Sequence, residues 1–99
     1  MNRFRLRAVL VVKAALRYTP AGLAVLEAGF RHTGTAVEAG LERELAFDVK
    51  ALALGSVGEQ LNREPLGAEL ELAGFLAPRS RRASRIDLHI TEYKRISGV

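Results

Sequence analysis

The stretch Leu41-Glu42-Arg43-Glu44-Leu45-Ala46-Phe47-Asp48-Val49-Lys50-Ala51-Leu52-Ala53-Leu54 decides the fold of this chain, because it fits two kinds of secondary structure. The apolar residues fit one face of a helix at Leu41, Leu45, Val49 and Leu52. They also fit one face of a strand at Leu45, Phe47, Val49, Ala51 and Ala53. The content of Leu, Ala and Glu favours the helix on propensity alone. The segments on either side determine which architecture each choice would produce.

Residues 3–18 predict a long first strand. Over residues 3–8 three arginines alternate with apolar residues, Arg3, Arg5 and Arg7 against Phe4, Leu6 and Ala8. A period of two is typical of a strand with one solvated face, here basic, and one buried face. Because a strand that reaches Tyr18 would be long, we expect a bend or bulge within it.

Turn signals and further alternation predict the remaining elements. The turn Thr19-Pro20-Ala21-Gly22 leads into a second strand over residues 23–32, followed by a loop through Thr33-Gly34-Thr35 to Gly40. Ser56-Val57-Gly58-Glu59 has the pattern of a capping box, which predicts a short helix over residues 57–64 that Pro65-Leu66-Gly67 ends. Two more strands are expected over residues 69–77 and 86–95, and the last three residues, Ser97-Gly98-Val99, are expected to fray.

Taken as a strand, residues 41–54 complete the order strand, strand, strand, helix, strand, strand. This is the order of the OB-fold, an all-β, five-stranded Greek-key barrel with one short helix, whose members bind oligonucleotides. The 99 residues suit a single domain of this kind, spanning residues 1–99.

Positive charge gathers at the two ends of the chain. Residues 1–20 carry five bases and no acid, residues 21–78 four bases against nine acids, and residues 79–99 six bases against two acids, which together give the net charge of +4. If the two ends are adjacent in the fold, they form one cationic surface, and such a surface indicates a polyanion, most often nucleic acid. Ribosomal or membrane-surface binding would give the same charge pattern.

Several classes of function find no support in the sequence. There is no cysteine, and the two histidines, His32 and His89, lack the spacing of zinc ligands. No segment approaches the roughly 20 apolar residues of a transmembrane helix. No catalytic constellation and no Gly-rich phosphate loop is present. We therefore expect a cytoplasmic binding module that is not an enzyme and has no cofactor.

A basic loop joins the last two predicted strands. The sequence Pro78-Arg79-Ser80-Arg81-Arg82-Ala83-Ser84-Arg85 places four arginines in eight residues. Such a loop can follow a flexible phosphate backbone while the strands stay rigid, and arginine keeps its charge at physiological pH. The alternative is a solvated hairpin tip that only aids solubility.

The chain resembles the primosomal replication protein N (PriB) family, a branch of the single-stranded-DNA-binding OB-folds. The resemblance spans nearly the whole chain and rests on short pieces whose order and spacing match: Asn2 ahead of the first strand, Leu16-Arg17 before the turn, Glu38-Ala39-Gly40 with Arg43, Gly55, Gly74-Phe75-Leu76 and Leu88-His89. It implies a replication restart factor, a homodimer that binds single-stranded DNA and stabilises the primosomal helicase on it, together with other primosome proteins. It also implies that residues 41–54 are a strand.

One departure from the family pattern bears on DNA binding. The family carries an aromatic residue in the third strand where this chain has Ala46. Phe47 is the next residue, and one step along a strand turns the side chain to the opposite face, so Phe47 is either core or a stacking platform. Because stacking contributes about 1–3 kcal/mol per base, we expect weaker DNA binding that depends more on charge.

The resemblance, together with charge, gives ten candidate DNA-binding residues: Arg17, Tyr18, Arg43, Phe47, Lys50, Phe75, Arg79, Arg81, Arg82 and Arg85. The arginines of the basic loop are the main candidates for phosphate contacts. Arg17 is either a phosphate contact or a solvated turn residue, and Arg43 and Lys50 can equally pair with Glu42 or Asp48. Phe75 is expected to face outward, as a platform or a dimer contact, and Tyr18 to stack on a base or pack over the turn.

Two other functions stay open at this stage. The acidic middle and the basic ends could serve protein contacts, which would make the chain a primosome scaffold with weak DNA affinity. A general single-stranded nucleic-acid-binding OB protein is the other alternative, because charge and stacking discriminate poorly between DNA and RNA.

Overall fold

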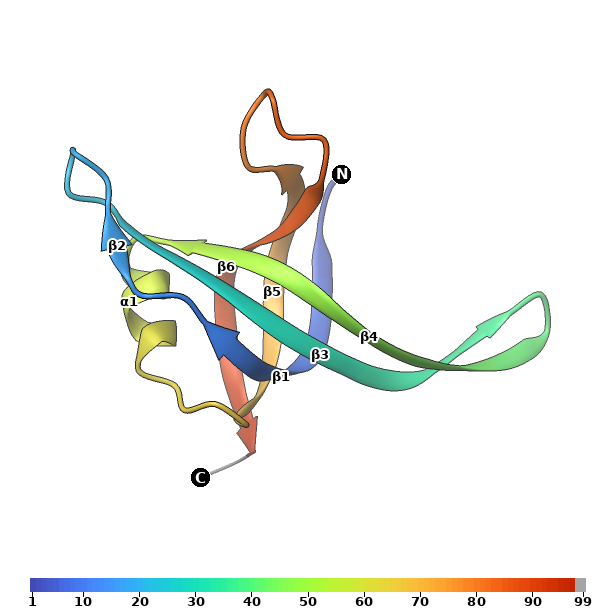
Figure 1. Cartoon of the computed structure of the whole chain (residues 1–99). Coiled ribbons are helices and arrows are strands. Elements are labelled where there is room, and N and C mark those ends of the chain that lie inside the picture. Colours follow the sequence, from blue (N-terminus) through green and yellow to red (C-terminus); the bar gives the residue numbers. More distant parts are fainter. Residues whose placement is uncertain (98–99) are drawn as a thin grey trace.

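Residues 1–97, the part of the chain that the computed structural model describes, form six strands and one short helix (Figure 1). In chain order these are β1 (Phe4–Lys13), β2 (Arg17–Tyr18), β3 (Ala24–Glu38), β4 (Leu41–Leu54), α1 (Ser56–Asn62), β5 (Glu69–Pro78) and β6 (Ile86–Ser97). Ser97 belongs to β6, while the expected fraying of Gly98 and Val99 lies outside the described residues.

The strands close into a barrel because β1 pairs on both sides. The order β1-β5-β6-β4-β3 is completed by pairing of β1 with β3. The first part of β1 pairs with β5 and its last part with β3, and the register with β3 shifts between Leu10 and Val12. This shift is the expected bulge. With β2 continuing the line of β1, the barrel has the strand order predicted for the OB-fold.

The ambiguous segment is strand β4, as the resemblance implied and against its helix propensity. It pairs with β3 along its whole length, from Leu41 opposite Glu38 to Leu54 opposite Val25, and its C-terminal part runs parallel to β6. Ala51 and Ala53 are buried between these two neighbours. Tertiary pairing therefore outweighs the local preference for a helix.

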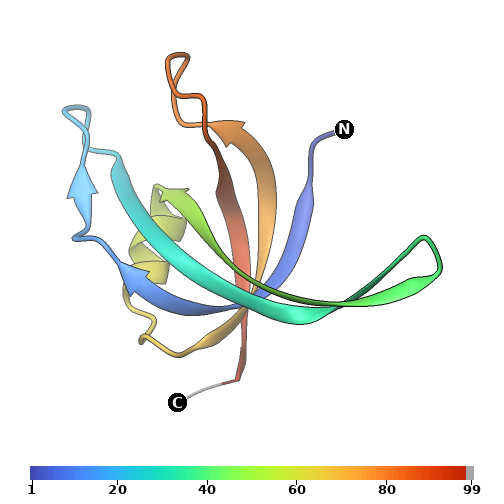
Figure 2. The same ribbon diagram turned by 45° about the vertical axis from the view of Figure 1, so that its right-hand side comes forward.

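The predicted loop over residues 33–40 is wrong, because β3 continues to Glu38. The chain reverses at Ala39 and Gly40, whose φ angles are 53° and 76°. Two positive φ angles are what a tight hairpin turn requires, so the strands stay paired up to the turn. Residues 32–47 form an arm that extends beyond the barrel (Figures 1 and 2).

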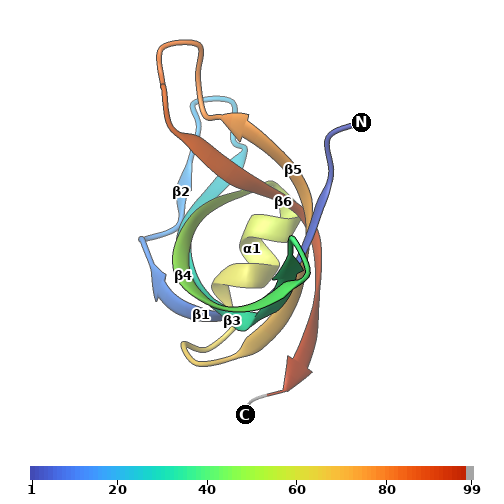
Figure 3. The same cartoon turned by 90° about the vertical axis from the view of Figure 1, so that its right-hand side faces the viewer.

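Helix α1 lies across one end of the barrel, as the view in Figure 3 shows. Its Leu61 is fully buried in the core. The predicted capping box is wrong: the N-cap is Gly55, with φ 71°, and no side chain caps the helix. The other end is stabilised by Lys13, whose Nζ donates to the carbonyl oxygens of Asn62 at 2.8 Å and Glu64 at 2.7 Å. The ammonium group of Lys13 therefore has a structural role at the end of α1.

Alternation along the strands separates an inner from an outer face. The inward side chains include the largest fully buried apolar ones, Phe30, Leu10, Leu26, Leu70 and Leu72. The inward position Gly74 has room for no side chain, because a Cβ there would lie 1.8 Å from the carbonyl oxygen of His89. The residues between these inward positions point away from the core and define the surface described next.

Candidate nucleic-acid interface

Four strands contribute one row of outward-pointing side chains, in which Leu52 is covered and only 6% exposed. The register places Glu27 of β3 opposite Leu52 of β4, Leu52 opposite His89 of β6, and His89 opposite Phe75 of β5. Three strand spacings separate the ends of the row, about 14 Å. We call this surface of β3, β4, β6 and β5 the outer face.

Phe75 supplies the aromatic group of the outer face. Its side chain is 40% exposed and stacks on the His89 ring, with 4.9 Å between centroids and 10° between planes. His89 in turn hydrogen-bonds through Nε2 to the carbonyl oxygen of Ala77 at 3.2 Å. A ring that is supported from below and open above is a platform on which a base can stack.

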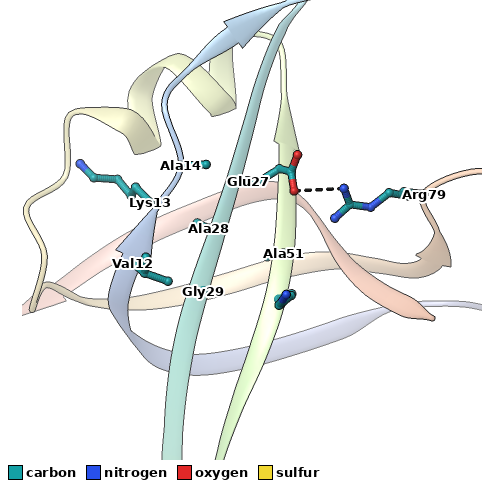
Figure 4. Close-up of a pocket in the computed structure, with 9 residues that line it drawn as sticks. Val12, Lys13, Ala14, Glu27, Ala28, Gly29, Ala51 and Arg79 are labelled. Atoms are coloured by element: carbon teal, nitrogen blue, oxygen red, sulfur yellow. Dashed lines mark hydrogen bonds and ion pairs between the residues drawn. The ribbon is translucent and has the colours of Figure 1, made fainter. Parts of the chain in front are cut away.

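A pocket of about 210 Å³ lies at the other end of the row (Figure 4). Its lining residues come from three strands and two loops, and they are Val12, Lys13, Ala14, Glu27, Ala28, Gly29, Lys50, Ala51 and Arg79. The exposed Lys50 is opposite Gly29 in the register, so the floor beside this ammonium group carries no side chain. Figure 4 shows Arg79 reaching toward Glu27 and Lys13 pointing away from it.

Glu27 holds two arginines from different elements. Its Oε2 accepts from Arg17 of β2 at 3.2 Å, and its Oε1 accepts from Arg79 at 3.0 Å. The hydrogen bond from Arg79, followed by that from Arg17, holds the pKa of the Glu27 carboxyl below its ordinary value. The carboxylate is therefore ionised at neutral pH.

Asp87 anchors the basic loop at its two ends. This carboxylate is 1% exposed and lies 3.2 Å from Nε of Arg79 and 3.3 Å from Nε of Arg85. The loop over residues 79–85 projects from the same end of the barrel as the turn over residues 19–22 (Figures 1 and 2). Two of its four arginines thus stabilise the base of the loop.

The other two arginines of the loop are at its tip. Arg81 and Arg82 are exposed, and within residues 1–97 neither takes part in an ion pair or hydrogen bond of its side chain. Their charges are available to a phosphate without loss of an internal contact. Of the predicted loop residues, these two are the free cations and Arg79 and Arg85 the anchors.

The structure brings most of the predicted residues to the outer face and its margins. Residues on this surface or in the loop beside it are Arg17, Lys50, Phe75, Arg79, Arg81, Arg82 and Arg85. Arg17 reaches it from β2, where it is opposite Val25. Charged and aromatic groups that are far apart in the sequence are therefore neighbours on one side of the barrel.

Three predicted residues lie elsewhere. Tyr18 faces the helix, and its hydroxyl donates to Glu59 at 3.2 Å, which raises the pKa of the tyrosine. Arg43 is on the arm and pairs with Glu38, not with the expected Glu42 or Asp48. Phe47 is also on the arm, 42% exposed and against the ring of His32, on the strand face opposite that of Lys50. Phe47 is therefore not part of the core.

The two basic ends of the chain meet only in part, where Arg17 and Arg79 share Glu27. β5 separates β1 from β6 in the sheet, and Arg5 of β1 lies 3.7 Å from Glu71 of β5. Lys13 is bound to the end of α1. The cationic surface is thus built from Arg17, Lys50 and the basic loop, and the arginines of β1 lie apart from it.

Sequence reasoning missed the two acids of this surface. Glu27 is the one charged residue in the apolar run of residues 23–30, and Asp87 comes two residues after Arg85. The proximity of Asp87 to Arg85 in the sequence is a sign of pairing, whereas no arginine close to Glu27 in the sequence is its partner. His89 lacks the spacing of a zinc ligand, and its role under Phe75 depends on the strand register, which the sequence alone does not give.

Residues 1–97 contain no cluster of three or more His, Cys, Asp or Glu side chains arranged to hold a metal ion. Within the same residues, no helix is long and apolar enough to cross a membrane.

Comparison with known proteins places these features in a family. The model of a family described as "another single-strand binding protein family" matches residues 2–92. Replication restart protein PriB of Bordetella pertussis is 39% identical over 98 residues, which cover 99% of this chain and 92% of that protein. The structure of PriB from Ralstonia solanacearum superimposes with a TM-score of 0.86 at 35% identity and covers 96% of this chain and 97% of the other.

A more distant neighbour agrees in fold. The single-stranded DNA binding protein of Thermus aquaticus has a TM-score of 0.79 at 22% identity over 99% of this chain and 51% of its own. The five-stranded barrel, the family match and the near-complete coverage of the relatives agree with one another. This chain belongs to the PriB family of replication restart proteins.

Proposed function

We propose that this chain binds single-stranded DNA across its outer face and acts in replication restart by stabilising the restart helicase on that strand. The observation that carries the proposal is the row from Glu27 to Phe75, with a supported aromatic platform at one end and a pocket between cations at the other. The arginine tip of residues 81 and 82 extends this surface beyond the sheet. Relatives that bear the name replication restart protein support the cellular role.

The proposed binding does not depend on the base sequence of the DNA. Arginines and Lys50 release counterions from the phosphate backbone, and Phe75 stacks on a base of any kind. Binding of this type decreases steeply with salt and depends little on base sequence. The protein acts as a binding module and not as an enzyme, in the cytoplasm, where bacterial DNA is replicated.

A second copy of the chain is the proposed homodimer partner. Residues 4–8 of β1 pair with β5 on one side, while pairing with β3 begins only at Val9. Among residues 1–97 no strand pairs with the other side of residues 4–8, and such an edge favours pairing with another strand. The arm over residues 32–47 meets this edge at its base, where Nδ1 of His32 lies 2.6 Å from the carbonyl oxygen of Arg7, and its exposed Val37 and Leu41 add apolar surface.

The first experiment is a salt titration of binding to a fluorescent oligo-dT, made on protein whose oligomeric state is known from sedimentation equilibrium. Tight binding that decreases steeply with salt supports the proposal. Negligible binding at low salt contradicts it and leaves the primosome scaffold as the function to test. If the protein is a monomer at the concentration used, the proposed dimer is contradicted, but the proposed DNA binding is not.

The helicase role needs its own measurement. The protein is added to the restart helicase on a forked substrate with a single-stranded arm, and helicase retention on the DNA is measured. Greater retention with the wild type than with an Arg81→Ala/Arg82→Ala variant supports the role. Equal retention with both shows that the DNA surface does not contribute to it.

A further inference from the structure

Glu27 is a negative group on a surface that is proposed to bind a negative polymer. It lies in the pocket, at one end of the row on the outer face, and its side chain is 35% exposed. A strand that follows the outer face from Phe75 toward the pocket would bring its phosphates close to this carboxylate. The presence of a carboxylate at this position should therefore affect how the surface binds DNA.

The contacts of Glu27 are those that a phosphate would receive. Each carboxylate oxygen accepts from a different guanidinium, Oε2 from Arg17 and Oε1 from Arg79. Arginine binds carboxylate and phosphate with the same fork of donors. The two arginines come from β2 and from the basic loop, so the carboxylate joins the two margins of the pocket.

We propose that Glu27 is an internal competitor for DNA phosphate, which occupies Arg17 and Arg79 in the free protein and must be replaced when the strand binds. This inference rests on the proposed function, because it concerns the affinity of the same surface. The low pKa of Glu27 agrees with it, since the carboxylate stays charged throughout the neutral range.

A purely structural role for Glu27 is the alternative, in which it pins the basic loop. The contacts of Asp87 argue against this alternative. Asp87 is 1% exposed and holds both Arg79 and Arg85, so the base of the loop stays anchored when Glu27 is neutral. Removal of the Glu27 charge should therefore free Arg17 and the Nη1 group of Arg79, while the bond from Nε of Arg79 to Asp87 leaves the loop in place.

The competitor predicts a moderate DNA affinity for a surface that carries several arginines. In the free protein the charge of Arg17 is balanced by Glu27, and that of Arg79 by Glu27 and Asp87. The net gain when a phosphate takes the place of Glu27 is small. The unpaired Arg81 and Arg82, together with Lys50, then supply most of the electrostatic attraction.

The test is oligo-dT binding by Glu27→Gln, a variant of the same shape without the charge. Glu92→Gln is the matched control, because Glu92 is an exposed acid that faces Ala73 of β5, away from the pocket. Both variants gain one unit of net charge. We expect Glu27→Gln to bind about fivefold or more tighter than wild type at low salt and Glu92→Gln less than twofold tighter. The salt slope of Glu27→Gln should stay near that of wild type, because Arg17 and Arg79 contact phosphate in both complexes.

A second variant tests the inference without changing Glu27. Arg17 has Glu27 as its ion-pair partner within residues 1–97. If that pair must break for DNA to bind, Arg17→Gln should lower the affinity less than about threefold, whereas Arg81→Gln should lower it more. In the Glu27→Gln background, the loss caused by Arg17→Gln should become larger.

The outcomes separate the two proposals. Tighter binding by Glu27→Gln, with Glu92→Gln near wild type, supports the competitor. If wild type binds DNA but Glu27→Gln binds equally or more weakly, the competitor is refuted while the proposed function stands. If Arg17→Gln costs as much as Arg81→Gln in the wild-type background, the competitor is refuted as well. If no form binds oligo-dT, both proposals are wrong.

Discussion

Arg79 donates a hydrogen bond from Nε to Oδ2 of Asp87 at 3.2 Å, and the carboxylate that accepts it is 1% exposed. The pair connects the first residue of the basic loop to the start of β6. Arg85, at the other end of the loop, approaches the same carboxylate. The most cationic loop of the chain is therefore fixed to the barrel by a buried acid.

Asp87→Asn should destabilise the protein by about 1–3 kcal/mol. The variant keeps the shape but removes a buried charge from its two partners, both of which are partly exposed and can be hydrated. The free energy of unfolding, measured by urea denaturation, checks this value. The control is Glu71→Gln, which removes the exposed pair with Arg5 and should cost less than about 1 kcal/mol. Equal losses for the two variants would show that the Asp87 contacts are no stronger than a surface pair.

Arg81→Ala/Arg82→Ala should weaken oligo-dT binding and flatten its dependence on salt. Each phosphate contact with a single strand contributes about 0.7 to the slope of log K against log salt, so the slope should decrease by up to about 1.4. The control is Arg63→Ala/Lys94→Ala, which removes the same charge from the end of α1 and from β6 well beyond the loop. An unchanged slope in the loop variant would refute the role of the tip.

Phe75→Ala should weaken DNA binding by about 1–3 kcal/mol, the range for loss of one stacked base. The salt slope should not change, because no charge is lost. Phe47→Ala is a matched control, since Phe47 has a similar exposed fraction, 42% against 40%, but lies on the arm against His32. Affinities from fluorescence titration at one salt concentration are sufficient. Equal losses for both phenylalanines would indicate that the strand path includes the arm.

Lys13→Gln should lower the stability of the fold and leave DNA affinity unchanged. The ammonium of Lys13 bonds two carbonyl oxygens at the end of α1, and a cation at a helix C-terminus contributes up to about 2 kcal/mol in a partly buried geometry. Thermal unfolding followed by circular dichroism measures the loss. A large decrease in DNA affinity of the folded variant would instead place Lys13 on the DNA path.

Stability should decrease between pH 10 and pH 12 because of Tyr93. Burial, and then its hydrogen bond to Glu64 at 2.9 Å, raise the pKa of Tyr93 to about 12 in the folded protein. In the unfolded chain the hydroxyl titrates near its ordinary value of about 10. Above that pH the unfolded state loses a proton that the folded state keeps, so stabilisation that is complete below pH 10 is lost as the pH rises through the folded pKa.

The reference for this pH effect is Tyr93→Phe. It removes the titrating group, so its unfolding free energy should fall less steeply than that of wild type over the same interval. Urea denaturation at several pH values gives both curves. Parallel curves would show that another group is responsible for the alkaline loss.

Several parts of the fold could be predicted from particular residues. The alternation of arginines with Phe4, Leu6 and Ala8 identified β1, and the apolar spacing of residues 69–77 and 86–95 identified β5 and β6 with small errors at their ends. These elements follow from a local period of two. The helix after Gly55 was also found, although the residue that caps it was not.

The candidate site was predicted in composition but not in arrangement. The sequence identified the basic loop and Phe75, and Phe75 is exposed as expected. It could not show that Arg79 and Arg85 form ion pairs with Asp87, or that Tyr18 faces the helix. Those facts depend on which strands are neighbours and in which register.

The sequence by itself determined the first strand and the last two, the position of the helix and the concentration of arginine between the last two strands, because each depends on residues close together in the chain. Tertiary structure alone decided that residues 41–54 are a strand, since the pairing of β4 with β3 and β6 outweighs helix propensity. It also decided which charges are free. Glu27 is separated from Arg79 by 52 residues, and only closure of the barrel brings the carboxylate and the guanidinium within 3.0 Å.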